Sequence, residues 1–171
     1  MIKKIDISSS KSINQIVYRI KPISTLLKFI THTSSGRMYP LYTMAIPFIL
    51  ESGFEIVRIG VIAFAFQVPI YLLSKNLIKR ERPSPSDEIS PIITPPDKYS
   101  FPSGHCASST LFTLIINQYM PWLTIYFIIW AIIIFISRVG LGIHYLSDCI
   151  FGVVLGFISF LIANQLLSIF F

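Results

Sequence analysis

The sequence predicts an all-α fold: a polytopic membrane helix bundle of five to six helices, with an N-terminal interfacial amphipathic helix. Three observations lead to this prediction. Of the 171 residues, 53% are hydrophobic and only 13% are charged, whereas soluble domains carry about 25% charged residues. The apolar residues form long runs. The net charge of +6 is concentrated ahead of those runs, which is not typical of a soluble protein.

The N-terminal element is a basic leader, residues 1–37, that contains one amphipathic stretch. Its charged residues are Lys3, Lys4, Asp6, Lys11, Arg19, Lys21, Lys28 and Arg37. Apolar side chains recur at helical spacing from Ser12 to Thr31, but three of these cations interrupt them. A cation is costly at the bilayer centre, so we expect a helix lying in the interface, with a spanning helix as the alternative. The expected partners are membrane lipids and not nucleic acid.

Five apolar segments follow and account for the bundle, and residues 38–171 are expected to form a single membrane domain. The segments are Met38–Leu50, Ile56–Ser74, Ser103–Met120, Pro121–Val139 and Leu146–Phe170. Several are shorter than the roughly 20 residues that span a bilayer, so tilt or burial against neighbours is implied. Pro47 and Pro69 interrupt two of them, which membrane helices tolerate when neighbouring groups satisfy the freed carbonyls.

A polar, proline-rich loop, residues 75–102, separates the second and third apolar segments. Its prolines exclude a regular helix, and a loop of this length is more often functional than a plain linker. If each apolar segment crosses the membrane once, both ends of this loop emerge on the same face as the connection at residues 137–148. Most ionisable residues near the membrane then converge on that face.

The first part of the converging set consists of groups suited to bind an anion. Lys75, Arg82 and Arg138 are cations, and the planar fork of a guanidinium matches phosphate oxygens in pairs. Ser103 begins a helix, so the backbone N–H groups near Gly104 would face an anion at the helix N-terminus. Taken one by one, these residues also fit cations that reach toward lipid headgroups and an ordinary helix start.

The second part of the set carries acid–base and nucleophilic groups. His144 and Asp148 are four residues apart on the last helix, so the carboxylate can accept the Nδ1 proton of the imidazole. Nε2 is then free to act as a nucleophile. His105 is the remaining titratable group and would be the general acid for the leaving oxygen. Together with the cations, these residues predict a phosphoryl-transfer site.

Three motifs in this sequence resemble those of the type 2 phosphatidic acid phosphatase superfamily of membrane lipid phosphatases. They are KNLIKRERP from Lys75, PSGH from Pro102 and SRVGLGIHYLSD from Ser137 to Asp148. The resemblance covers residues 30–170 and implies a phosphatase that needs no metal and no cofactor. It implies that His144 attacks phosphorus to form a phosphohistidine, that Asp148 orients it and that His105 protonates the leaving group. Lys75, Arg82, Ser103, Gly104 and Arg138 would hold the phosphoryl oxygens.

The expected activity is hydrolysis of a lipid phosphate or diphosphate ester, of the undecaprenyl diphosphate, phosphatidylglycerophosphate or phosphatidate class. Lys79, Arg80 and Lys98 lie near the motifs and would favour a diphosphate. The alternatives are a lipid phosphotransferase and a lipid-binding protein without activity. Carboxylates of the loop, Asp87, Glu88 and Asp97, are weaker candidates as metal ligands.

The expected location is a bacterial plasma membrane. Counting Lys and Arg predicts a cytoplasmic active face if five segments span, whereas the family resemblance favours an external one, which requires residues 12–31 to span. His32 is expected to lie at the interface with no role in the site. Cys106 and Cys149 are expected to be packing residues.

Overall fold

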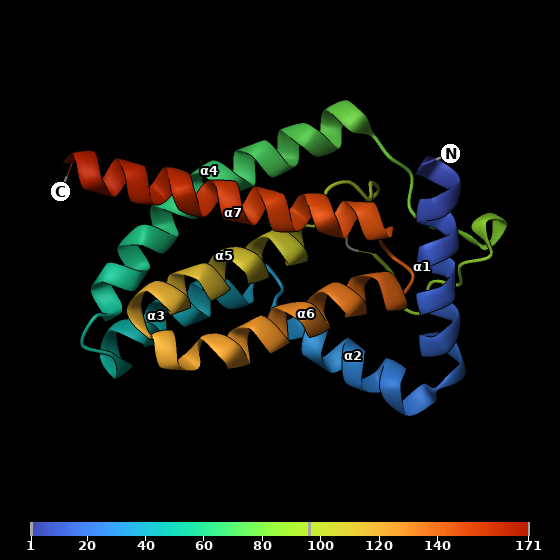
Figure 1. Ribbon diagram of the computed structural model, residues 1–171, viewed down its shortest axis with the longest axis horizontal. Coiled ribbons are helices and arrows are strands. Elements are labelled where there is room, and N and C mark those ends of the chain that lie inside the picture. Colours follow the sequence, from blue (N-terminus) through green and yellow to red (C-terminus); the bar gives the residue numbers. More distant parts are fainter. Residues whose placement is uncertain (1, 96, 171) are drawn as a thin grey trace.

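The computed structural model describes residues 2–95 and 97–170, and the described chain is a bundle of α-helices without strands (Figure 1). The helices are α1 (Ile2–Arg19), α2 (Lys21–Thr33), α3 (Met38–Ile49), α4 (Gly53–Ile78), α5 (Gly104–Tyr119), α6 (Thr124–Gly140) and α7 (Leu146–Phe170). Two short 3-10 turns, η1 (Pro85–Asp87) and η2 (Pro121–Leu123), complete the elements. The predicted all-α fold is confirmed.

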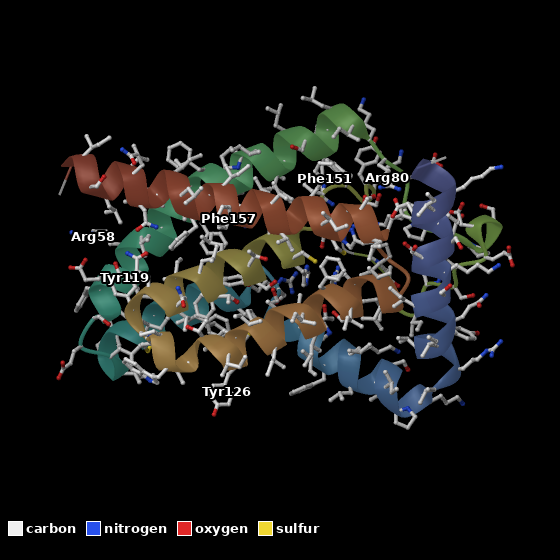
Figure 2. All side chains as sticks on the ribbon, in the orientation of Figure 1. Arg58, Arg80, Tyr119, Tyr126, Phe151 and Phe157 are labelled. Carbon is white, nitrogen blue, oxygen red and sulfur yellow. The ribbon has the colours of Figure 1, made fainter. Side chains whose placement is uncertain are left out.

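Three of these helical segments are long and apolar enough to cross a bilayer: Gly53–Ile78, Pro121–Gly140 and Leu146–Ile169. Helix α3 is apolar but shorter. Tyr126 points outward from the bundle (Figure 2), and large apolar side chains such as Tyr126 and Phe157 are 67% and 48% exposed. Helix α5 packs against α4, α6 and α7. Since it lies among other helices, it can carry buried hydroxyl groups at Ser109 and Thr113.

The amphipathic stretch predicted as one helix is divided between α1 and α2. The backbone at Ile20 is not helical, and Lys21-Pro22 begins the second helix, because proline is accepted in a first helical turn but not in a helix interior. Asn14 donates hydrogen bonds to the carbonyl oxygens of Ser90 and Gly140, and Thr31 Oγ1 accepts one from Arg138. Both parts therefore lie at the same end of the bundle, and residues 12–31 do not form one continuous helix.

The ends of α4 to α7 that carry the three motifs meet at one end of the bundle, beside α1, as the topology predicted (Figure 1). Arg80 lies at this end, whereas Arg58 and Tyr119 lie at the other (Figure 2). Helix α4 extends to Ile78 and closes at Lys79, which has a left-handed backbone. The loop therefore begins four residues later than the predicted 75–102, and Lys75 lies in the last turn of α4.

Two glycines of α7 bring that helix against α5. A Cβ at Gly152 or Gly156 would lie within 3.0 Å of the backbone of Ser103 or Ala107, a separation that only small residues permit. The backbone N–H of Ser103 donates to the carbonyl oxygen of Asp148 across this contact, at 3.0 Å. The close approach therefore joins the second motif to the third.

Candidate active site

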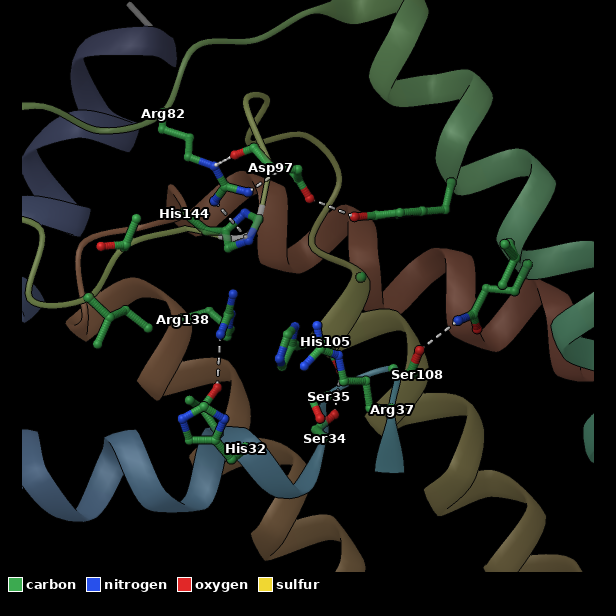
Figure 3. Close-up of a pocket in the computed structure, with 18 residues that line it drawn as sticks. His32, Ser34, Ser35, Arg37, Arg82, Asp97, His105, Ser108, Arg138 and His144 are labelled. Atoms are coloured by element: carbon green, nitrogen blue, oxygen red, sulfur yellow. Dashed lines mark hydrogen bonds and ion pairs between the residues drawn. The ribbon is translucent and has the colours of Figure 1, made fainter. Parts of the chain in front are cut away.

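A cavity of about 610 Å³ opens at the motif end of the bundle. Five of the predicted site residues line it: Arg82, Gly104, His105, Arg138 and His144. Figure 3 labels four of them, Arg82, His105, Arg138 and His144. Lys75, Ser103 and Asp148 do not line the cavity and lie behind those residues. The three motifs are thus brought together, although not every predicted residue reaches the cavity.

His144 lies in the turn between α6 and α7 and is 2% exposed. Two residues earlier, Gly142 has a φ of 74°, a conformation that glycine adopts without strain. The Nε2 atom of His144 lies 3.4 Å from Nη1 of Arg82. Burial, followed by the charges of Arg138, Arg82 and Lys75, holds the pKa of His144 well below its usual range. A neutral imidazole is the form that can act as a nucleophile.

Asp148 lies behind the ring of His144 and is fully buried. Its Oδ2 is 3.7 Å from Nδ1 of His144, which is longer than a hydrogen bond, and that buried Nδ1 has no hydrogen-bond partner among the described residues. Oδ2 instead accepts the backbone N–H of Tyr145 at 2.9 Å. Oδ1 accepts from Arg80 at 2.7 Å. The carboxylate is therefore fixed in place beside the imidazole.

Two guanidinium groups from the motifs, those of Arg82 and Arg138, face the cavity. Arg138 is 2% exposed. One of its terminal nitrogens donates to Thr31, and its buried Nε has no partner among the described residues. Because buried donors in proteins are almost always paired, this arrangement fits an anion in the cavity. Arg82 donates to the backbone carbonyl oxygens of Asp97 and Ile143. These bonds hold its guanidinium group beside the imidazole of His144.

The start of α5 forms the adjacent wall, which holds Gly104 and His105. Ser103 is fully buried, and its hydroxyl accepts the backbone N–H of Cys106 as the N-cap of α5. A Cβ at Gly104 would lie 3.0 Å from the ring of Tyr71, so glycine lets the helix start approach α4. Ser103 thus shapes this wall from behind, whereas Gly104 and His105 reach the cavity.

Asp97, which the sequence suggested only as a weak metal ligand, pairs with two of the predicted phosphate-binding cations. Its Oδ1 lies 2.6 Å from Lys75 Nζ and 2.8 Å from Arg82 Nη2, and Tyr71 donates to Oδ2. Burial alone would raise the pKa of Asp97, but the hydrogen bonds from Lys75 and Arg82 lower it below its usual value. In Figure 3 this carboxylate lies above His144, beside Arg82.

The last turn of α2 and the turn between α2 and α3 supply a cavity wall that was not predicted from the sequence. His32, Ser34, Ser35, Gly36 and Arg37 all line the cavity. The hydroxyl of Ser34 donates to the backbone carbonyl of His105 at 3.1 Å, which fixes this turn against α5. His32, which the sequence placed at the interface without a role in the site, thus also lies on the cavity wall. No local pattern marks these residues, because only the tertiary fold brings them to the motifs.

The cations predicted to favour a diphosphate do not line the cavity. Arg80 pairs with Asp6 and Asp148, and Lys98 lies over the ring of Tyr99. Lys79 closes helix α4. Within residues 2–95 and 97–170, no group of three His, Cys, Asp or Glu side chains is placed to hold a metal ion.

A profile of the PAP2 superfamily matches residues 56–169 of this sequence. The chain belongs to the PAP2 superfamily. This match includes all three motifs and leaves α1, α2 and α3 outside it. The family resemblance predicted from the motifs is thereby confirmed.

Curated PAP2 relatives match part of the chain. An undecaprenyl-diphosphatase of Sulfolobus acidocaldarius is 35% identical over 105 residues, which are 59% of this chain and 50% of that protein. A decaprenylphosphoryl-5-phosphoribose phosphatase of Mycobacterium tuberculosis is 35% identical over 89 residues, 51% of this chain and 48% of that protein. The chain spans about half the length of these relatives.

Two solved structures share the PAP2 fold with this chain at 21% sequence identity. The PAP2-type phosphatidylglycerolphosphate phosphatase of Bacillus subtilis superposes with a TM-score of 0.79, covering 99% of this chain and 88% of that one. LpxE of Aquifex aeolicus superposes with a TM-score of 0.80, covering 92% and 93%. Together with the apolar helices, the fold and family identify an integral membrane protein.

Proposed function

We propose that this PAP2 protein is a metal-independent phosphatase that hydrolyses a lipid phosphate or diphosphate ester through a phosphohistidine on His144. The observation that carries the proposal is the buried imidazole of His144, which lines a cavity with Arg82 and Arg138 and is backed by Asp148. Cations placed where charge develops in the transition state stabilise phosphoryl transfer. Arg82 and Arg138 supply this charge beside His144, and Lys75 shares the carboxylate of Asp97 with Arg82.

The reaction follows from the positions of these residues. Nε2 of His144 attacks phosphorus, and the bond from phosphorus to the leaving oxygen breaks as the phosphohistidine forms. His105 donates a proton to a leaving alkoxide. Water then attacks the phosphohistidine and releases inorganic phosphate, with His105 taking the proton of that water. As positive charge grows on His144, the 3.7 Å separation from Asp148 closes to a hydrogen bond.

The substrate that we propose is a polyprenyl-type lipid carrying a phosphate or diphosphate. Two relatives are named for undecaprenyl and decaprenyl compounds. In-line transfer sends the leaving group to the side of phosphorus opposite the nucleophile. The α2–α3 turn joins His105 on that side and adds Arg37 and His32 to the cavity wall. An anionic leaving group, such as the phosphate of a diphosphate, would be stabilised there.

Purified full-length protein tests the activity. In detergent with EDTA it should release inorganic phosphate from a prenyl diphosphate, and vanadate should inhibit, because vanadate adopts the five-coordinate geometry of phosphoryl transfer. His144→Ala should abolish both turnover and the acid-labile phosphoenzyme. Activity that vanishes on chelation and returns only with a divalent ion would overturn the metal-free mechanism. Transfer of the phosphoryl group to a second lipid without phosphate release would identify a phosphotransferase instead.

A substrate panel tests the assignment of the leaving-group side. Arg37→Gln should raise KM about tenfold or more for farnesyl diphosphate, since a charge-assisted hydrogen bond is lost, and should change KM little for phosphatidate. Lys21→Gln, on an exposed position of α2 outside the cavity, is the matched control. Equal effects of Arg37→Gln on both substrates would show that Arg37 does not contact the leaving phosphate.

A further inference from the structure

Arg80 joins the catalytic aspartate to the N-terminal helix. Its Nη1 donates to Oδ1 of Asp148 at 2.7 Å, and its Nη2 donates to Oδ2 of Asp6 at 2.6 Å. Ser147 lies between them: its hydroxyl accepts from Arg80 and donates to Asp6, each at 2.6 Å. The ring of Tyr145 covers the guanidinium at 4.1 Å. One planar group is therefore held between two carboxylates and an aromatic ring.

Burial makes this network important for the position of Asp148. The side chains of Asp148 and Asp6 are 0% and 8% exposed, and that of Arg80 is 24% exposed. A buried carboxylate without a partner is strongly unfavourable. Arg80 binds Oδ1 and leaves Oδ2 as the oxygen that faces Nδ1 of His144. The guanidinium on Oδ1 and the backbone N–H of Tyr145 on Oδ2 together fix which carboxylate oxygen faces the imidazole.

Helix α1 also satisfies the backbone at the start of α7. Asp6 Oδ1 accepts the N–H of Ser147 at 3.0 Å, and Ser10 Oγ accepts the N–H of Leu146 at 2.9 Å. The first N–H groups of a helix have no partner within that helix, and a carboxylate there is further favoured by the helix dipole. Side chains of α1 thus cap α7 one turn or less from Asp148.

These contacts come from a part of the chain outside the PAP2 match, which begins at residue 56. We propose that Asp6 and Arg80 are positioning residues of the reaction: the α1 helix, acting through Arg80, holds Asp148 in register with His144. This inference rests on the function proposed above. It assigns to α1 a part in catalysis that is separate from contact with lipid.

Kinetics of purified full-length Asp6→Asn and Arg80→Gln test the proposal. Each should lower kcat about 10- to 100-fold, since small displacements of a positioned group have effects of this size. KM and the inhibition constant of vanadate should change less than about threefold, because the cavity residues remain. Asp6→Glu should restore part of kcat. Glu88→Gln is the matched control, because it breaks the exposed ion pair between Lys11 of α1 and the loop without reaching Asp148.

A readout independent of turnover separates failure of this proposal from failure of the proposed function. In ¹⁵N NMR of histidine-labelled protein, the His144 signals should shift in Asp6→Asn and Arg80→Gln but not in Glu88→Gln. If wild-type protein hydrolyses no lipid phosphate but these shifts occur, the function is wrong and the positioning contact stands. Unchanged His144 signals with unchanged kcat in Asp6→Asn would overturn the positioning role. So would equal losses of kcat in Asp6→Asn and Glu88→Gln.

Discussion

Asp97 is the single residue whose contacts bear most directly on how an anion enters the cavity. Its carboxylate pairs with both Lys75 and Arg82, the cations that the motif assigns to phosphate oxygens. A bound phosphoryl group must share these donors with Asp97 or displace it. Under the proposed function, the carboxylate neutralises these cations before an anion binds and then competes with the phosphoryl group for Arg82, which lines the cavity.

Asp97→Asn should strengthen inhibition by vanadate about three- to tenfold, because about 1 kcal/mol of charge repulsion is removed. Vanadate inhibition constants of the purified variant and wild type provide the measurement. Asp87→Asn is the control, since Asp87 accepts from Tyr145 and does not contact Lys75 or Arg82. Weaker inhibition in Asp97→Asn would mean that the carboxylate orients the cations and does not compete.

The protonation state of His144 gives a second prediction at this scale. Burial and three nearby cations lower its pKa, so at about pH 6.5, where an ordinary imidazole is half protonated, His144 should be neutral. The unfolded chain then binds more protons than the folded one as pH falls below about 6.5. The contribution of His144 to stability is thus fully present above that pH and is lost as pH falls toward the folded pKa.

¹⁵N NMR of the imidazoles measures this pKa, with the His144 signal assigned by its absence in His144→Ala. A midpoint at or above pH 6.5 would contradict the prediction. Arg82→Gln should raise the midpoint, because it removes a positive charge beside Nε2. Lys21→Gln, which is outside the cavity, should not.

How far the sequence predicts the site differs among residues for a physical reason. His105, Arg138 and His144 lie in motifs whose spacing already implies one face, and the structure brings them to one cavity. Lys75 and Ser103 lie just behind it. Arg37 and His32 were missed, because they come from the end of α2 and the turn after it, which are distant in sequence from the motifs and have no motif of their own.

At the scale of secondary structure, the helix boundaries that are set by a capping residue or by the end of an apolar run were predicted best. Ser103 caps α5, and the apolar runs of α6 and α7 match their helices closely. The division of the N-terminal stretch at Ile20 was missed, since the apolar periodicity continues through Lys21-Pro22. The extension of α4 to Ile78 was also missed, because Lys75 and its polar neighbours resemble a loop.

Contact between α5 and α7 is the packing on which the site depends, and glycine permits it. Gly156→Leu should destabilise the protein by at least about 1–3 kcal/mol, because its side chain would overlap the backbone of Ala107. Thermal unfolding in detergent should show a midpoint lowered by several degrees. Gly60→Ala is the control: a Cβ there meets only Ile115, at 4.0 Å, so the midpoint should stay equal or rise slightly. Equal midpoints for Gly156→Leu and wild type would show that α5 and α7 can separate without cost.

At the scale of the whole molecule, the arrangement of charge follows the bundle. Helices α1 and α2 lie with the three motifs at one end, while Glu55 and Arg58 pair at the other. The chemistry of the site requires some of these cations, but the basic leader adds more of them on the same side. A counting rule based on charge and the family resemblance therefore favour opposite orientations, although both are compatible with the same fold.

Cysteine labelling tests this arrangement in membranes. Ser8→Cys in α1 and Ser86→Cys in the loop should react with an impermeant reagent from the same side, and Glu51→Cys from the other, because all three positions are exposed and the bundle separates the two ends. Cys106 and Cys149 are buried, so the wild-type chain serves as the background control. If Ser8→Cys and Ser86→Cys react from opposite sides, the N-terminal helices cross the membrane and their contacts with Ser147 and Ser90 do not form.

In intact cells, reaction at Ser86→Cys would place the cavity on the external face expected from the family. Protection there, with reaction only after lysis, would place it on the cytoplasmic face that the basic leader favours.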